Sequence, residues 1–136
     1  MHYSFEIRIN EDLGIIDFAN KHGIINVPYQ PLRRNRTAKQ HWPLLEAFSK
    51  KYGKTQNQII LRWMTARGFH PLVKSETTKH IDSNLEALWF EMKLADLESM
   101  DSFRPPNYRS KDIDWWMDNK TPEKAVYMHA LPNIFD

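Results

Sequence analysis

A helix, a short strand and a second helix are predicted by residues 55–88, TQNQIILRWMTARGFHPLVKSETTKHIDSNLEAL. Apolar residues recur every three or four positions between the N-cap candidate Thr55 and Gly68, a residue that suits a helix end. The apolar run at 70–73 is too short for a helix and indicates a strand. Residues 77–88 then place apolar side chains at positions i, i+4 and i+7, which predicts a second amphipathic helix.

Three further segments have helical periodicity. Residues 10–22 begin with acidic residues, place Leu13 on an apolar face and precede a glycine. Residues 41–53 carry a stripe of leucine and aromatic side chains and end at a glycine, and residues 93–100 form a shorter amphipathic segment. We interpret these stripes as core-facing surfaces and not as part of a cofactor site.

A second strand is predicted at residues 24–29, IINVPY, and we expect it to be buried because the run is apolar and rich in β-branched residues. Strands and helices therefore alternate along the chain. That order indicates βαβ units, in which helices cover a parallel sheet, and the predicted fold class is α/β.

The C-terminal part has a different character. From Arg104 onward no sustained period is present, which predicts an irregular tail over residues 104–136. Trp115, Trp116 and Met117 lie together in this tail. We expect the tail to pack against residues 1–103 or against a partner.

Composition excludes several classes of protein. The chain has 136 residues, 41% of them hydrophobic, with 19 Lys and Arg against 17 Asp and Glu, which is typical of a globular domain. It has no Cys, so disulfides, a thiol nucleophile and thiolate metal sites are excluded. No apolar run approaches the roughly 20 residues of a membrane span, and the acidic N-terminal stretch does not resemble a signal peptide. We expect a cytoplasmic protein with no membrane partner.

Charge is distributed unevenly. Residues 1–80 hold 13 Lys and Arg against 6 Asp and Glu, whereas residues 81–136 hold 6 against 11. The basic side chains could attract the phosphates of a nucleotide, or they could form an ordinary solvated surface. We expect no nucleic-acid partner, because no nucleic-acid-binding motif accompanies them. The basic side chains that could attract phosphates are Arg33, Arg34, Arg36, Lys39, Lys50, Lys51 and Lys54.

Three motifs in order resemble the C-terminal part of an aldo-keto reductase. They are a Tyr-x-Pro-Leu turn at residues 29–32, a Gly-Lys-Thr-x-x-Gln helix entry at residues 53–58, and a Leu-Val-Lys-Ser turn at residues 72–75. The resemblance covers about residues 2–103. It implies a (β/α)8 barrel, of which this chain holds the βα units from about the end of strand six to strand eight, and NADPH-dependent reduction of carbonyl compounds.

The resemblance also implies a partial NADP(H) site at the turns that follow strands seven and eight. Tyr29 would stack on the nicotinamide ring and the turn after it would pass near the pyrophosphate. Lys74 would contact the 2′-phosphate, and His80 would lie along the adenosine. The implied cofactor-binding residues are Tyr29, Gln30, Leu32, Lys74, Ser75, Thr77, His80 and Asn84.

Several differences from the family affect this expectation. Ser83 stands where the family commonly has Glu, and its side chain is short for reaching an adenine amino group. His80 stands where the family commonly has Arg, and a neutral imidazole holds a phosphate less strongly than a guanidinium, so we expect weak or vestigial NADP binding. Nothing in the chain matches the motifs that carry the family's catalytic Asp, Tyr, Lys and His. We therefore expect no catalytic residue, and the histidines show no metal-ligand spacing.

Two functional interpretations remain open. The chain is either a truncated reductase that retains part of the cofactor site, or a non-catalytic interaction module. In the second case, the tail, a second copy or a separately encoded N-terminal half covers the edge of the half-barrel, because an uncovered parallel strand promotes aggregation.

Overall fold

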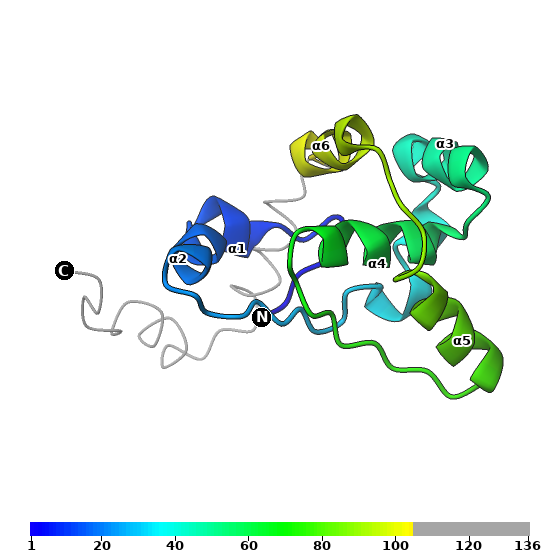
Figure 1. The fold of residues 1–136 in the computed structure, drawn as a ribbon, viewed down its shortest axis with the longest axis horizontal. Coiled ribbons are helices and arrows are strands. Elements are labelled where there is room, and N and C mark those ends of the chain that lie inside the picture. Colours follow the sequence, from blue (N-terminus) through cyan, green and yellow to red (C-terminus); the bar gives the residue numbers. More distant parts are fainter. Residues whose placement is uncertain (105–136) are drawn as a thin grey trace. The chain divides into compact units, whose positions relative to one another are not determined.

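This computed structural model describes residues 1–104 of the chain. Most of these residues are helical, and α4 lies in the middle of the other helices (Figure 1). Helix α4 contacts α3, α5 and α6, so it is the element around which this part of the chain is built. The α-helices and the 3₁₀ turns η1 and η2 are, in chain order, α1 (Ile9–Asp12), α2 (Ile15–Lys21), η1 (Arg33–Asn35), η2 (Ala38–Gln40), α3 (Pro43–Tyr52), α4 (Gln56–Ala66), α5 (Thr78–Glu86) and α6 (Leu94–Ser102).

Local signals explain the position of α4. The Thr55 hydroxyl accepts a hydrogen bond from the Gln58 N–H at 3.2 Å, and the Gln58 side chain accepts one from the Thr55 N–H at 3.0 Å. This capping box confirms the predicted N-cap. The helix then buries Ile59, Ile60 and Trp63 in the core, which confirms the predicted apolar stripe. The predicted helices at 41–53, 55–68, 77–88 and 93–100 correspond to α3, α4, α5 and α6.

Three extended segments lie side by side and parallel. His2 is bridged to Tyr29, and Tyr29 is bridged to Leu72. Hydrogen bonds continue the pairing on each side: the Tyr29 N–H donates to the Met1 carbonyl at 2.9 Å, and the Leu72 N–H donates to the Pro28 carbonyl at 2.8 Å. The parallel arrangement expected from the strand and helix order is therefore present, in the order in which the segments follow one another along the chain.

The predicted strands at 24–29 and 70–73 are wrong in extent and, for the first, in burial. The pairing consists of isolated bridges and not of continuous strands. Pro28, whose carbonyl accepts from Leu72, has no N–H to donate back toward residues 70–72, which shortens the pairing. Ile24 and Ile25 are 54% and 64% exposed, because no described segment pairs with the chain ahead of Asn26.

The predicted helix at 10–22 is also wrong as a single element. It is divided into α1 and α2 by Gly14, whose φ of 72° lies in the left-handed region. The break turns Leu13 outward, so that this residue is 55% exposed instead of lying on the core face. Ile16 and Ala19 of α2 are buried as expected.

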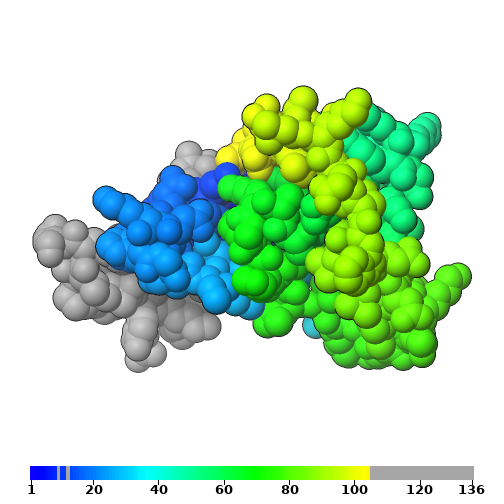
Figure 2. Space-filling view, in the orientation of Figure 1, coloured from blue at the N-terminus to red at the C-terminus, as the bar shows by residue number. Residues whose placement is uncertain are grey.

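The core lies between the N-terminal segment and α4. Tyr3 and Phe5 are fully buried, and their rings lie against that of Trp63 at centroid distances of 5.9 and 6.2 Å. The space-filling view shows the blue N-terminal part packed directly against the green central part of the chain (Figure 2). The Arg8 side chain is buried in the same place, with its guanidinium 4.3 Å from the Trp63 ring.

Helix α5 differs from α4 because none of its residues is buried. Its apolar face, Ile81, Leu85 and the following Leu88, remains about half exposed. The tail at 104–136, with its Trp115 cluster, lies beyond the described residues except for Arg104, so the predicted packing of the tail and the division at residue 103 stay predictions. Within the described residues, no helix is long and apolar enough to cross a membrane.

Candidate cofactor site

The pairing of the extended segments brings the two predicted turns together at the carboxyl ends of these segments. Tyr29 ends the middle segment and is bridged to Leu72 of the third. Because parallel segments end at the same side, the turn that begins at Gln30 and the turn that begins at Val73 lie next to each other. In a (β/α)8 barrel, active sites are built at the carboxyl ends of the strands.

The second turn leads directly into α5. Thr77 is the N-cap of this helix, and its hydroxyl accepts a hydrogen bond from the His80 N–H at 3.4 Å. The N–H groups of Thr78 and Lys79 belong to the first turn of the helix, which has no helical acceptors, so this end of α5 favours anions. Thr77, predicted as a cofactor contact, therefore also caps the helix.

Lys74 has a neighbour that sequence reasoning did not consider. Its ammonium lies 2.6 Å from a carboxylate oxygen of Glu76, and both side chains are largely exposed. An exposed pair of this kind contributes little to stability. It nevertheless places a negative charge beside the lysine that was predicted to contact a phosphate, which weakens the positive potential of the turn.

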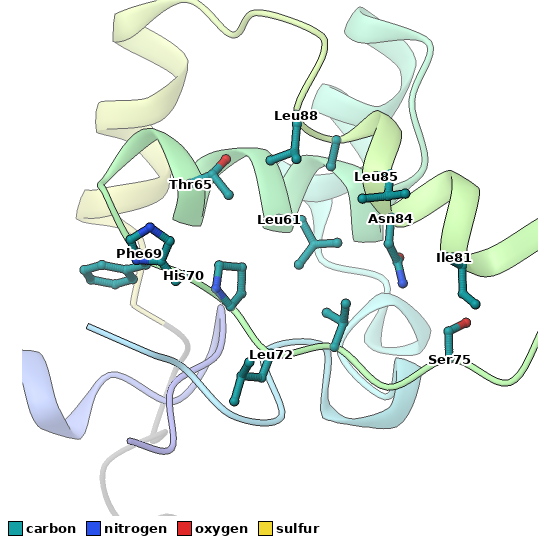
Figure 3. Close-up of a pocket in the computed structure, with 13 residues that line it drawn as sticks. Leu61, Thr65, Phe69, His70, Leu72, Ser75, Ile81, Asn84, Leu85 and Leu88 are labelled. Atoms are coloured by element: carbon teal, nitrogen blue, oxygen red, sulfur yellow. The ribbon is translucent and has the colours of Figure 1, made fainter. Parts of the chain in front are cut away.

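A cavity of about 510 Å³ lies between α4, residues 69–75 and α5. Of the predicted cofactor residues, Ser75 and Asn84 line it, whereas Lys74, Thr77 and His80 lie outside and are exposed. Figure 3 shows the Ser75 hydroxyl and the Asn84 amide at the end of the cavity beside Ile81. Most of the remaining lining is apolar, so the predicted residues of this turn are divided between a cavity wall and the outer surface.

The first turn is held in an unusual backbone conformation. Between residues 30 and 41, positive φ angles occur at five residues other than glycine, all between 47° and 64°: Gln30, Arg33, Arg34, Asn35 and His41. Such conformations are rare for side chains other than Gly, Asn and Asp. Residues that contact this loop must therefore stabilise it.

A buried carboxylate that the sequence prediction missed lies against this loop. Glu6 is only 5% exposed, and one of its oxygens accepts hydrogen bonds from Arg33 at 2.9 Å and from Gln40 at 3.3 Å. The Thr37 hydroxyl lies 2.9 and 2.8 Å from the two oxygens. The only sequence signal is an acidic residue between Phe5 and Ile7, which does not reveal its partners.

Tyr29 is 43% exposed and its ring stacks on that of His2, with centroids 5.1 Å apart. Burial lowers the pKa of His2, and the nearby Arg33 charge lowers it further. The His2 imidazole is therefore held neutral to a lower pH than usual. One face of the Tyr29 ring, which was predicted to stack on a nicotinamide, is thus already taken by an aromatic neighbour.

Several residues of the basic stretch are paired within the molecule. Arg33 is paired with Glu6, and the Lys51 ammonium lies 2.6 Å from a carboxylate oxygen of Asp96. Lys54 lies over the Phe90 ring. Within the described residues, no group of three or more His, Asp and Glu side chains could hold a metal ion.

Comparison with known proteins identifies the class to which this fold and site belong. The model of the Aldo/keto reductase family matches residues 1–105. The chain is a member of the aldo-keto reductase family, and the resemblance of the three motifs is confirmed.

The individual relatives include an NAD(P)H-dependent reductase. An NAD(P)H-dependent D-xylose reductase XYR1 from Pyricularia oryzae is 34% identical over 80 residues, which are 54% of this chain and 25% of the relative. An aldo-keto reductase family 1 member C23 from Equus caballus is 32% identical over 64% of this chain and 30% of its own length. The chain spans about a quarter to a third of these relatives.

Solved structures support the fold. The thermostable aldo-keto reductase Tm1743, in complex with the inhibitor epalrestat, superimposes with a TM-score of 0.67 at 30% identity, covering 74% of this chain and 37% of the other. A mutant of Gox0644, in complex with NADPH, gives a TM-score of 0.68 at 19% identity, covering 79% and 38%. The described residues are thus similar to part of the (β/α)8 barrel of these enzymes.

Proposed function

We propose that this chain supplies part of the NADP(H) site of an aldo-keto reductase, the family whose reaction is NADPH-dependent carbonyl reduction. The observation that carries the proposal is the parallel bridge between Tyr29 and Leu72. Both predicted cofactor turns begin directly after these residues, at the carboxyl ends of the parallel segments. The family match and the NAD(P)H-dependent relatives support it.

The residues fit a dinucleotide in part. Lys74, Ser75 and Thr77 stand at the opening of α5, where helical N–H groups and a lysine favour a phosphate. Ser75 and Asn84 could extend these contacts into the cavity beside the helix. Glu76, and an imidazole at His80 where the family commonly has a guanidinium, work against strong binding. NADPH, when bound, supplies the hydride, and the residues of this chain would bind and orient it.

Binding of nucleotides by the full 136-residue chain tests the proposal. Isothermal titration should show weak binding of NADPH, and weaker binding of NADH. Lys74→Met should abolish the preference for NADPH, because it removes the charge that faces a 2′-phosphate. Lys21→Met, at the exposed end of α2, is the matched control and should change neither affinity. Equal affinities of the wild type and Lys74→Met for NADPH would contradict the proposal.

We also propose that the chain alone does not reduce carbonyl compounds. Carbonyl reduction needs a proton donor at the carbonyl oxygen, and no motif in the sequence corresponds to the donors of the family. A steady-state assay with several aldehydes and NADPH should give no turnover above that of Tyr29→Phe or of buffer. Turnover clearly above both controls would show that catalytic residues are present. A cytoplasmic location stays a prediction.

A second candidate function, as a non-catalytic interaction module, is favoured by the exposed apolar lining of the cavity. Leu72 is 62% exposed, and the apolar face of α5 lies beside it. A second copy of the chain or a separately encoded N-terminal half of the barrel would cover this surface. Assembly that proceeds equally well with and without NADPH would favour this function over cofactor binding.

A further inference from the structure

We propose that Glu6 is the positioning residue for the loop of residues 30–41, and that it holds this loop in the conformation needed for cofactor binding. The inference rests on the proposed function, because Gln30 and Leu32 of this loop are among the proposed cofactor contacts. It assigns a role to a residue outside the turns that the family resemblance identifies.

The first argument is the position of Glu6. Its side chain is 6% exposed, so its charge must be compensated within the protein. The compensating donors come from two places: Ser4, whose hydroxyl lies 3.1 Å away, and the loop itself. The segment that carries Glu6 is fixed in turn, because the Ser4 hydroxyl accepts a hydrogen bond from the Ile7 N–H at 3.0 Å. Glu6 is therefore a rigid anchor and not a flexible surface side chain.

The second argument is the set of loop contacts. Arg33, Thr37 and Gln40 all donate to the Glu6 carboxylate, so one side chain holds the start, the middle and the end of the segment 33–40. Hydrogen bonds to a charged acceptor are stronger than neutral ones. Thr37 is fully buried, and its hydroxyl lies within hydrogen-bond distance of both oxygens. Loss of the carboxylate would leave a buried hydroxyl and a guanidinium without their acceptor.

The third argument is the strain of the loop. Arg33, Arg34 and Asn35 are consecutive residues with positive φ angles, and Gln30 and His41 add one more at each end. Residues in such conformations persist only where the surroundings hold them. The contacts of Glu6 join this loop to the buried N-terminal segment, so the loop should relax when they are removed.

The experiment measures loop opening and nucleotide affinity separately in the full chain. Trypsin cleaves after Arg34 and Arg36, which lie in the loop, whereas Arg62 and Arg67 lie in and just after α4 and serve as internal reference sites. Glu6→Ala should increase cleavage in the loop at least about tenfold relative to the reference sites, because opening is no longer opposed by the carboxylate.

Affinities for two ligands distinguish positioning from general destabilisation. NADPH spans both turns, whereas adenosine 2′,5′-bisphosphate carries only the part assigned to the turn at Lys74. Glu6→Ala should weaken NADPH binding about tenfold and leave the affinity for the bisphosphate within about twofold. A general loss of structure would weaken the binding of both NADPH and the bisphosphate.

Three further variants keep the test decisive. Glu6→Gln retains the shape of the side chain and replaces Glu6→Ala in the test if that variant does not fold. It should change loop cleavage and NADPH affinity in the same direction but by less. Thr37→Val, which removes a loop donor, should act in the same direction. Glu98→Gln, at an exposed position of α6, is the matched control and should change neither readout.

The outcomes separate the two proposals. Unchanged loop cleavage in both Glu6 variants, or equal weakening of both ligands, would overturn the positioning role. If the wild type bound neither NADPH nor the bisphosphate, the proposed function would fail, and the functional part of this inference would fail with it. Selective loss of NADPH affinity together with selective cleavage of the loop would establish both.

Discussion

Single buried charges organise the core of the described residues. The Arg8 guanidinium donates to the carbonyls of Phe5 and Met100, each at 2.9 Å, and it is fully buried. Burial lowers its pKa, although the nearby Tyr3 and Glu11 oppose this effect. Such a cation stabilises the fold only because its hydrogen bonds are satisfied.

Replacing Arg8 should therefore cost far more than replacing an exposed arginine. Arg8→Met keeps an unbranched apolar side chain but removes the guanidinium and leaves two carbonyls without donors, and we expect a loss of roughly 2–4 kcal/mol in the free energy of unfolding. Arg62→Met, whose partner Glu91 is 87% exposed, should cost less than about 1 kcal/mol. Urea unfolding at pH 7 measures both, and equal losses would contradict the interpretation.

Glu11 should make stability depend on pH. Burial alone would raise its pKa, but the charges of Arg67 and Arg8 outweigh burial and lower the pKa below its usual 4.5. A carboxyl with a lowered pKa contributes stability that is fully present above 4.5 and is lost as the pH falls through the folded-state pKa. Glu11→Gln should be less stable than the wild type at pH 7, and the difference should shrink below pH 4.5. A difference independent of pH in urea unfolding would exclude this role.

These charges show where sequence reasoning ends at the residue scale. The Arg8 hydrogen bond to Met100 joins residues 92 positions apart, and the Glu6 hydrogen bond to Arg33 joins residues 27 positions apart. Contacts of this kind depend on how the helices pack, which no local pattern contains. The two turns can be located from the sequence because their motifs are local, whereas the contacts of Glu6 with residues 33–40 cannot.

At the scale of elements, local signals located most helices but did not predict the burial of all of them. The cap at Thr55 and the glycine at position 53 mark the real limits of α4 and α3. Gly14, however, divides the predicted helix 10–22, because a glycine inside a periodic pattern does not reveal its φ angle. The apolar face of α5 predicts burial that the described residues do not provide, since burial depends on a neighbour and not on periodicity.

The two threonine caps should differ in their effect on stability. Thr55→Ala removes the capping box of a helix whose apolar face is buried, and we expect a loss of about 1 kcal/mol. Thr77→Ala removes a 3.4 Å hydrogen bond from a helix with no buried residue, and its loss should be less than half of that. Urea midpoints of the two variants test the difference, and an equal or larger effect at Thr77 would mean that α5 is more tightly packed than its exposure indicates.

At the scale of the whole molecule, the third parallel segment pairs on one side only among the described residues. Residues 70–72 pair on one side with residues 26–28, and the side chains next to them line the apolar cavity together with α5. The alternation of strands and helices in the sequence predicts the order and direction of these segments. It does not predict how few residues pair, because that number depends on how the segments are placed in space and because Pro28 has no N–H to donate.

This apolar surface should make the isolated chain associate with itself. Burying roughly 300 Å² of apolar surface at about 25 cal/mol per Å² is worth several kcal/mol, enough to drive weak association. The double variant Leu85→Lys, Leu88→Lys should remain folded, because both side chains are about half exposed, and it should sediment as a monomer at concentrations where the wild type does not. Leu94→Lys, at a 70% exposed site on α6 outside the cavity, is the control and should associate like the wild type. A wild type that is monomeric at every concentration, or a control that also dissociates, would show that this surface is not the site of association.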